Sequence, residues 1–83
     1  MSEKFIDGIG YLYYGTESHE EGGYMEKTRG WWIRRTPGGK PGSSFPPEYL
    51  GRNRDEAALN AHEPEVRRAL GIKTLRDYQE ERR

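Results

Sequence analysis

Two segments of the chain alternate between apolar and polar side chains in the way that half-buried β-strands do. In the first segment, Ile9, Tyr11 and Tyr13 share one side, while Leu12 and Tyr14 share the other. We predict a β-strand over these positions. The glycines on either side of Ile9 indicate a bulge or the close approach of another backbone.

The second alternating segment is Tyr24–Arg35. One face carries Met25, Lys27, Arg29, Trp31, Ile33 and Arg35, and the other carries Tyr24, Glu26, Thr28, Gly30, Trp32 and Arg34. Because adjacent side chains on a strand point to opposite faces, the two tryptophans cannot share one core. Ile33 accompanies Trp31, so we expect Trp31 in the core and Trp32 either beneath helices or partly exposed. We expect the polar stretch Gly15–Gly23 between the two strands to be a nine-residue loop.

A turn-rich region and an edge strand follow. Thr36–Glu48 contains four prolines and three glycines, which is typical of turns. A third strand is predicted at Glu48–Gly51, and the two prolines before it favour a place at the edge of the sheet.

The remainder of the chain predicts short helices. Asn53 with Glu56 resembles a capping box, so a first helix begins there and ends near His62, before Pro64. A second helix, Pro64–Leu70, starts on proline and stops at a glycine. A third begins at Thr74 and places Leu75 and Tyr78 on one face.

These elements define an α+β fold class. We expect a two- to three-stranded antiparallel sheet covered by two or three short helices. The whole chain, residues 1–83, is expected to be a single domain, with the sheet part in residues 1–51 and the helical part in residues 52–83.

Charge is balanced overall but unevenly placed. Residues 1–26 hold one lysine against six acids, residues 27–54 hold seven cations against one acid, and residues 55–83 hold six cations against seven acids. A dipolar surface of this kind can steer a charged partner. Alternatively, the acidic and basic strands pair with each other across a hairpin.

Composition narrows the class of protein. With no cysteine, disulfides and thiolate metal sites are excluded. No apolar run approaches the roughly 20 residues of a membrane span, and the first residues lack the apolar stretch of a signal peptide. We therefore expect a soluble cytoplasmic protein.

The sequence contains few groups of residues that could bind a metal or catalyse a reaction. His19-Glu20-Glu21 and His62-Glu63 contain metal-ligand types, but zinc normally takes three or four well-placed ligands, so we interpret them as solvated loop residues. The run Gly38–Ser44 lacks the phosphate-loop pattern because Pro41 follows the lysine. We expect no metal, no cofactor and no enzymatic activity.

The strongest functional signal is the basic, aromatic hairpin. Its cations lie near Tyr24 and two further aromatic residues, and the predicted partner-binding residues are Trp32, Arg34, Arg35, Tyr49, Arg29 and Lys40. Trp, Tyr and Arg dominate protein hot spots, and the same types track phosphates and stack bases in nucleic-acid binders. A third interpretation is a sheet core in which arginine stems pack on tryptophan faces by cation–π contact.

An acidic surface is the second candidate. Glu17, Glu20 and Glu21 could imitate phosphates toward a nucleic-acid-binding protein, and the alternative is a solvated hairpin tip. Spare aromatics also favour a homodimer that buries Trp32.

Two resemblances accompany these features. The stretch "GWWIRR…YLGRNRDEAALNAH" resembles the layout of DNA binders of the integrase-arm kind, built from a three-stranded sheet and a helix. A short, cysteine-free, charge-rich chain with surplus aromatics is similar in size and character to phage or mobile-element accessory proteins of the anti-CRISPR inhibitor type. That resemblance implies a protein that blocks the working surface of a nuclease complex. The expected function is thus a small inhibitor or adaptor of a protein partner, with nucleic-acid binding or homo-oligomer formation as alternatives.

Overall fold

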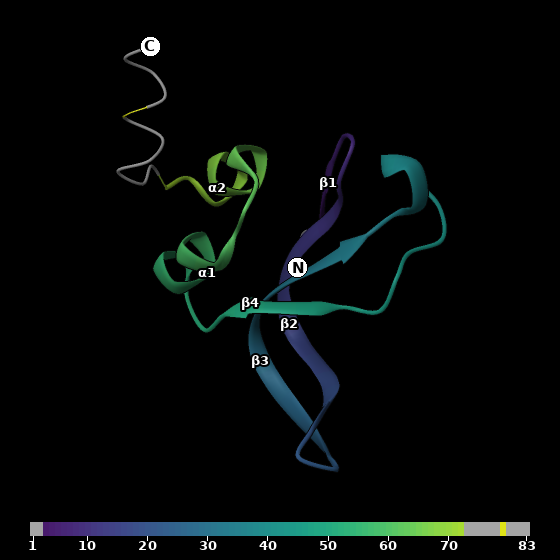
Figure 1. Ribbon diagram of the computed structural model, residues 1–83. Coiled ribbons are helices and arrows are strands. Elements are labelled where there is room, and N and C mark those ends of the chain that lie inside the picture. Colours follow the sequence, from purple (N-terminus) through teal and green to yellow (C-terminus); the bar gives the residue numbers. More distant parts are fainter. Residues whose placement is uncertain (1–2, 73–78, 80–83) are drawn as a thin grey trace.

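The computed structural model describes residues 3–72 and residue 79, and the chain folds as an α+β protein. Four antiparallel strands lie side by side in chain order, with bounds β1 Lys4–Ile6, β2 Gly10–Glu21, β3 Tyr24–Arg35 and β4 Glu48–Gly51. A short 3-10 turn, η1 Pro37–Gly39, follows β3, and the helices are α1 Arg54–Asn60 and α2 Pro64–Leu70 (Figure 1). The predicted fold class is confirmed, but the predicted strand number is too low.

The strand that the sequence did not reveal is β1, which pairs with the beginning of β2 from Lys4↔Leu12 to Ile6↔Gly10. Three residues are too few to display an alternating pattern. The close backbone approach predicted from the nearby glycines is confirmed, because a Cβ atom on Gly10 would lie 2.1 Å from the Arg34 carbonyl oxygen.

The central element is a long hairpin formed by β2 and β3. Its ladder runs without interruption from Gly10↔Arg35 to Glu21↔Tyr24, so the predicted nine-residue loop is wrong. Only Gly22 and Gly23 form the turn, with φ of 60° and 86°, which is the backbone of a type I′ hairpin turn. The outer half of β2 escaped prediction because it extends past the core and therefore carries no apolar alternation.

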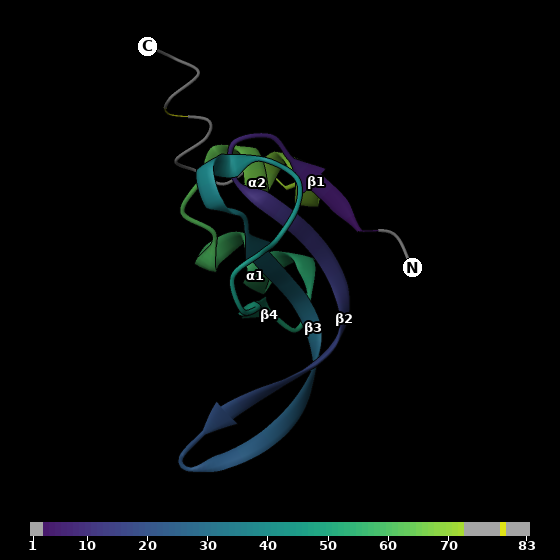
Figure 2. The same ribbon diagram turned by 90° about the vertical axis from the view of Figure 1, so that its right-hand side faces the viewer.

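The outer part of this hairpin leaves the rest of the molecule. Pairing with β1 ends at Leu12, and pairing with β4 ends at Trp31. We call residues 15–30 the arm. It projects past the helices and curves as it does so (Figure 2), and the principal extents of the molecule are 45 × 26 × 24 Å.

The main core lies between the inner half of the sheet and the two helices. Its buried members come from both layers and are Ile6, Ile9, Leu12, Ile33, Leu50, Ala57, Ala58, Ala61, Val66 and Leu70. Three alanines on and next to α1 allow that helix to lie close to β4, where Gly51 leaves no room for a side chain against the α1 backbone. Removing this apolar surface from water, at roughly 25 cal/mol per Å², is the main stabilising term.

The helix boundaries follow the predicted signals. The Asn53 side chain accepts a hydrogen bond of 2.9 Å from the Glu56 backbone N–H, which caps α1. Pro64 is the first residue of α2, and Gly71 ends it with a left-handed backbone. The third predicted helix, from Thr74 with Leu75 and Tyr78, lies outside the described residues.

A second, aromatic cluster occupies the opposite face of the sheet. Trp32 is 0 % exposed, and its ring lies 5.1 Å from Tyr49 and 5.7 Å from His19 between ring centroids. Trp31 faces the helices and packs against the main core, as predicted, but it is only partly buried. The prediction that Trp32 lies beneath helices or is partly exposed is wrong, because the curved arm and β4 cover that face instead.

Candidate binding surface of the arm

The six residues predicted to bind a partner do not form one surface. Trp32 is fully buried, and Tyr49 is half-buried against it. Arg34 and Arg35 are adjacent on β3 and therefore emerge on opposite faces. Arg29 lies on the arm and Lys40 follows η1, so these two exposed cations belong to different parts of the molecule.

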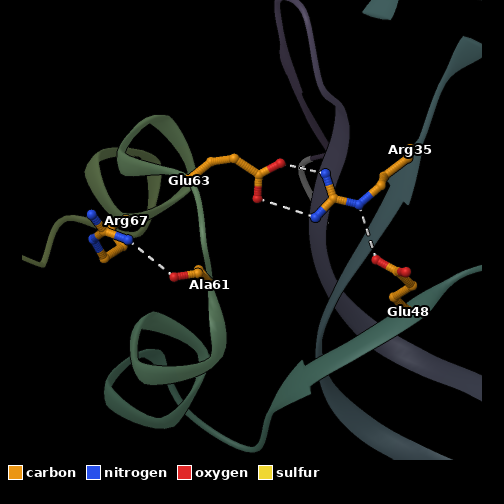
Figure 3. A network of polar contacts seen from close by, with 5 residues as sticks. All are labelled: Arg35, Glu48, Ala61, Glu63 and Arg67. Atoms are coloured by element: carbon orange, nitrogen blue, oxygen red, sulfur yellow. Dashed lines mark hydrogen bonds and ion pairs between the residues drawn. The ribbon is translucent and has the colours of Figure 1, made fainter.

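Arg35 connects three elements of the fold. Its guanidinium donates hydrogen bonds to both carboxylate oxygens of Glu63, at the start of α2, and one of 3.1 Å to Glu48 on β4 (Figure 3). Hydrogen bonds from Arg35 hold the pKa of Glu63 below its ordinary value, and those bonds to Glu63 raise the pKa of Arg35. Arg35 therefore links these elements of the fold, and most of its guanidinium N–H groups are not available to bind a partner.

Arg34 is also occupied. Its guanidinium pairs with Glu3 and lies over the rings of Tyr11 and Tyr13, at 5.3 and 5.0 Å from their centroids. The cation–π interpretation of the arginines thus holds for Arg34, with tyrosine in place of tryptophan. Burial, followed by the nearby Glu17 carboxylate, raises the pKa of the Tyr13 phenol.

His19 lies within the aromatic cluster and not in a solvated loop, so that interpretation of His19 is wrong. It pairs across the hairpin with Glu26, yet its ring contacts Trp32 and stacks on Tyr49 at 11° between ring planes. In a flat ribbon, His19 and Trp32 would lie about 20 Å apart along the strands. The contact therefore requires the arm to bend back over Trp32.

Two further hydrogen bonds hold this bend. The Trp32 indole N–H donates to the Gly15 carbonyl oxygen at 3.1 Å, and His19 Nε2 lies 2.6 Å from Thr28 Oγ1. Gly30 is also required, because a Cβ atom there would lie 2.5 Å from the Gly51 carbonyl oxygen and 2.8 Å from Tyr49 Cε1. These contacts at the base of the arm fix its curvature.

The helix-side face of the arm is open along its length. Six exposed side chains lie on it in two rows, namely Thr16, Ser18 and Glu20 on β2 and Met25, Lys27 and Arg29 on β3. The face continues inward to Tyr14 and Trp31, whose rings meet edge to face at 5.6 Å. The Arg54 guanidinium, from the first turn of α1, lies 5.8 Å above the Trp31 ring.

We call Tyr14, Lys27, Arg29, Trp31 and Arg54 the basic strip. Among the described residues, neither Lys27 nor Arg29 has an ion-pair or hydrogen-bond partner, so both charges face solvent. Of the six predicted partner-binding residues, only Arg29 belongs to this strip.

The tip of the arm is exposed and partly apolar. Tyr24 is 74 % and Met25 is 70 % exposed, immediately after the glycine turn. The two side chains point to opposite faces of β3 at the end of a projecting element, where the described fold offers neither of them cover.

The predicted acidic surface is divided by strand alternation. Glu17 and Glu20 belong to opposite faces of β2, where Glu17 is half-buried and Glu20 is exposed. Glu21 pairs through its backbone with Tyr24 at the end of the ladder. Glu17 and Glu20 therefore do not combine on one face of the arm.

The sequence did contain signals for the site residues that were missed. The face assignment of Lys27, Arg29 and Trp31 was correct, but Trp31 was expected in the core and Lys27 was not among the predicted partner-binding residues. The double glycine at 22–23 marks a two-residue turn and would have placed Tyr24 at a tip. Arg54 carries no comparable signal, because its approach to Trp31 depends on how α1 packs.

Comparison with family models, with curated proteins and with solved structures gave no match. Within residues 3–72, no helix is long and apolar enough to cross a membrane. The same part of the chain holds no group of three or more His, Cys, Asp or Glu side chains suited to a metal ion.

Proposed function

We propose that this chain is a non-catalytic, cytoplasmic binding protein that inhibits or adapts a protein partner, and that the arm is its partner-binding element. One observation carries the proposal: Tyr24 and Met25 are 74 % and 70 % exposed at the end of a projecting hairpin. Tyrosine is enriched among interface hot spots, and methionine adapts its shape to the surface it meets.

The shape of the arm supports the same function. Fixed by the contacts of Trp32 and His19 at its base, the arm presents its tip without a large ordering cost on binding. A narrow two-stranded ribbon can enter a concave surface that a flat domain face cannot reach. The partner expected from this geometry has a cleft with an apolar floor.

A matched pair of variants tests the proposal. Tyr24→Ser with Met25→Ser removes the apolar tip, whereas Leu59→Ser removes an equally exposed apolar side chain, at 80 %, from α1. In affinity capture from nuclease-treated lysate of the source organism, we expect a protein retained by the wild type and by Leu59→Ser. We expect its recovery to fall at least tenfold with the tip variant, which corresponds to about 1.4 kcal/mol.

Equal recovery with the tip variant and with Leu59→Ser would contradict the proposal. A photo-crosslinking residue at position 24, compared with one at position 59, gives an independent measurement. Crosslinks to the captured protein are expected from position 24 alone.

The specific form of the proposal is an inhibitor of the anti-CRISPR type, supported by the small size and charge-rich character of the chain. Added to purified RNA-guided nuclease complexes, the wild type should suppress DNA cleavage and the tip variant should not. Undiminished cleavage with every complex of the host that carries the gene would reject this form and leave the general binding role intact.

Homodimer formation loses its original support. That expectation rested on Trp32 being free for a second copy, and Trp32 is covered within one chain. Homodimer formation itself stays a prediction, which sedimentation at high concentration would test.

A further inference from the structure

The basic strip is a second surface, distinct from the tip, and it has a regular layout. Lys27, Arg29 and Trp31 occupy alternate positions of β3, so their side chains follow one another on one face at about 6.6 Å intervals. Small hydroxyl residues, Ser18 and Thr16, lie directly across from the two cations and leave them accessible.

The inner end of the strip is aromatic. Trp31 is partly exposed, Tyr14 supports it edge-on at 5.6 Å, and the Arg54 guanidinium lies 5.8 Å from its centroid. A tryptophan with a cation beside it offers both a stacking surface and a phosphate contact.

The surrounding charges leave the strip positive. Glu20 lies at its outer end across from Met25, and Asp55 follows Arg54 in the first turn of α1. The next acid, Glu56, is paired with Arg52 at 3.3 Å. Three cations therefore face two acids at the margins, and between Lys27 and Trp31 the arm face carries no acid.

We propose that the basic strip binds single-stranded nucleic acid. The phosphates lie on Lys27, Arg29 and Arg54, and a base stacks on the Trp31–Tyr14 pair. Regular cations in line with an aromatic platform suit a polymer with evenly repeated charges and accessible base faces. In a duplex the base faces are stacked on one another, so duplex DNA would use the cations and leave Trp31 without a role.

This inference does not depend on the proposed protein partner. The tip residues Tyr24 and Met25 lie outside the strip, so the tip variant should bind oligonucleotides as the wild type does. Failure of one proposal therefore leaves the other standing.

The test uses fluorescence anisotropy with fluorescein-labelled oligothymidine and oligouridine of about 20 nucleotides. The strip variant is Lys27→Gln with Arg29→Gln. The matched control is Lys4→Gln with Lys40→Gln, which removes two exposed cations elsewhere. We expect the Kd of the strip variant to be at least tenfold higher than that of the wild type, and the Kd of the control to change at most twofold.

Salt dependence supplies a second readout. Each phosphate contact on a single strand contributes about −0.7 to the slope of log K against log salt. The strip variant loses two contacts, so its slope should be less negative by about 1.4. A Trp31→Leu variant, with retained circular dichroism, should lose at least fivefold in affinity.

Several results would overturn the inference. These are the absence of binding by the wild type at low salt, equal losses in the strip and control variants, and tighter binding of duplex than of single strands. Equal binding of polyglutamate would also overturn it, because it would identify the strip as a contact for acidic protein.

Discussion

Trp32 is the residue on which the arm depends. Among the described residues it is the largest fully buried side chain, it donates a hydrogen bond to the Gly15 carbonyl, and two other rings pack against it. Its neighbour Trp31 has one side on the core and another toward solvent. The two adjacent indoles therefore differ in burial, because the arm covers one face of β3 and leaves the other open.

This difference predicts unequal costs for the same substitution. Trp32→Phe removes buried ring volume and leaves the Gly15 carbonyl without its donor, so we expect a loss of roughly 2–4 kcal/mol of unfolding free energy. Trp31→Phe should cost less than about 1.5 kcal/mol, since a partly exposed ring is replaced by a smaller one. Urea unfolding followed by circular dichroism measures both, and similar costs would argue against the assigned burial.

Tryptophan fluorescence provides an independent check on the burial of Trp31 and Trp32. In Trp31→Phe the remaining indole is buried, so its fluorescence should resist quenching by acrylamide. In Trp32→Phe the remaining indole should be quenched readily.

Among the elements, α2 is joined to the sheet by the Arg35–Glu63 contact in addition to its apolar face. Glu63 precedes the first residue of α2, and Arg35 ends β3. Because the pKa of Glu63 is lowered in the folded protein from its ordinary 4.5, this contact stabilises the fold fully above that value. The contribution is lost as pH falls through the folded-state pKa.

Glu63→Gln should therefore cost about 1 kcal/mol at neutral pH, a modest value because both side chains are partly exposed. The difference between wild type and variant should shrink as pH falls below the ordinary carboxyl pKa and vanish once pH is below the folded-state pKa of Glu63. Denaturant unfolding across a series of pH values from neutral to acid measures it. Glu65→Gln, an exposed neighbour on α2, serves as the control, and a difference that persists unchanged in acid would contradict the assignment.

Prediction from sequence succeeded where the signal is local. Asn53, Pro64 and Gly71 bounded the helices because capping and φ restrictions act within a few residues. The alternation of β3 was assigned correctly for the same reason.

Prediction from sequence failed where the local structure depends on distant parts of the chain. The polar residues from Thr16 to Glu21 form a strand because β3 pairs with them, which their own composition does not indicate. Trp32 is covered because His19 reaches it through the bend of the arm. No local pattern encodes that bend, so the sequence did not reveal that Trp32 is the covered indole.

At the scale of the whole molecule, a compact body of inner sheet and helices carries the arm (Figure 1). α1 and α2 have seven residues each, and their buried apolar side chains share one core with those of the inner sheet. Isolated helices of this length are unstable in water. The inner sheet and the two helices should consequently unfold together.

A peptide of residues 52–72 tests this dependence. We expect little helical circular dichroism from the peptide at temperatures where the full chain is folded, because Val66 and Leu70 lose their packing surface. A helical spectrum in the isolated peptide would show that the helices do not require the sheet.

The paired ladder of the arm also determines how related chains could vary in length. Because side chains alternate with a period of two, inserting two residues into each strand would extend the reach by roughly 7 Å and keep every outer side chain on its original face. Inserting one residue into each strand would transpose Tyr24 and Met25 relative to the body. Among natural variants with functional arms, insertions and deletions here should therefore occur as even, matched sets.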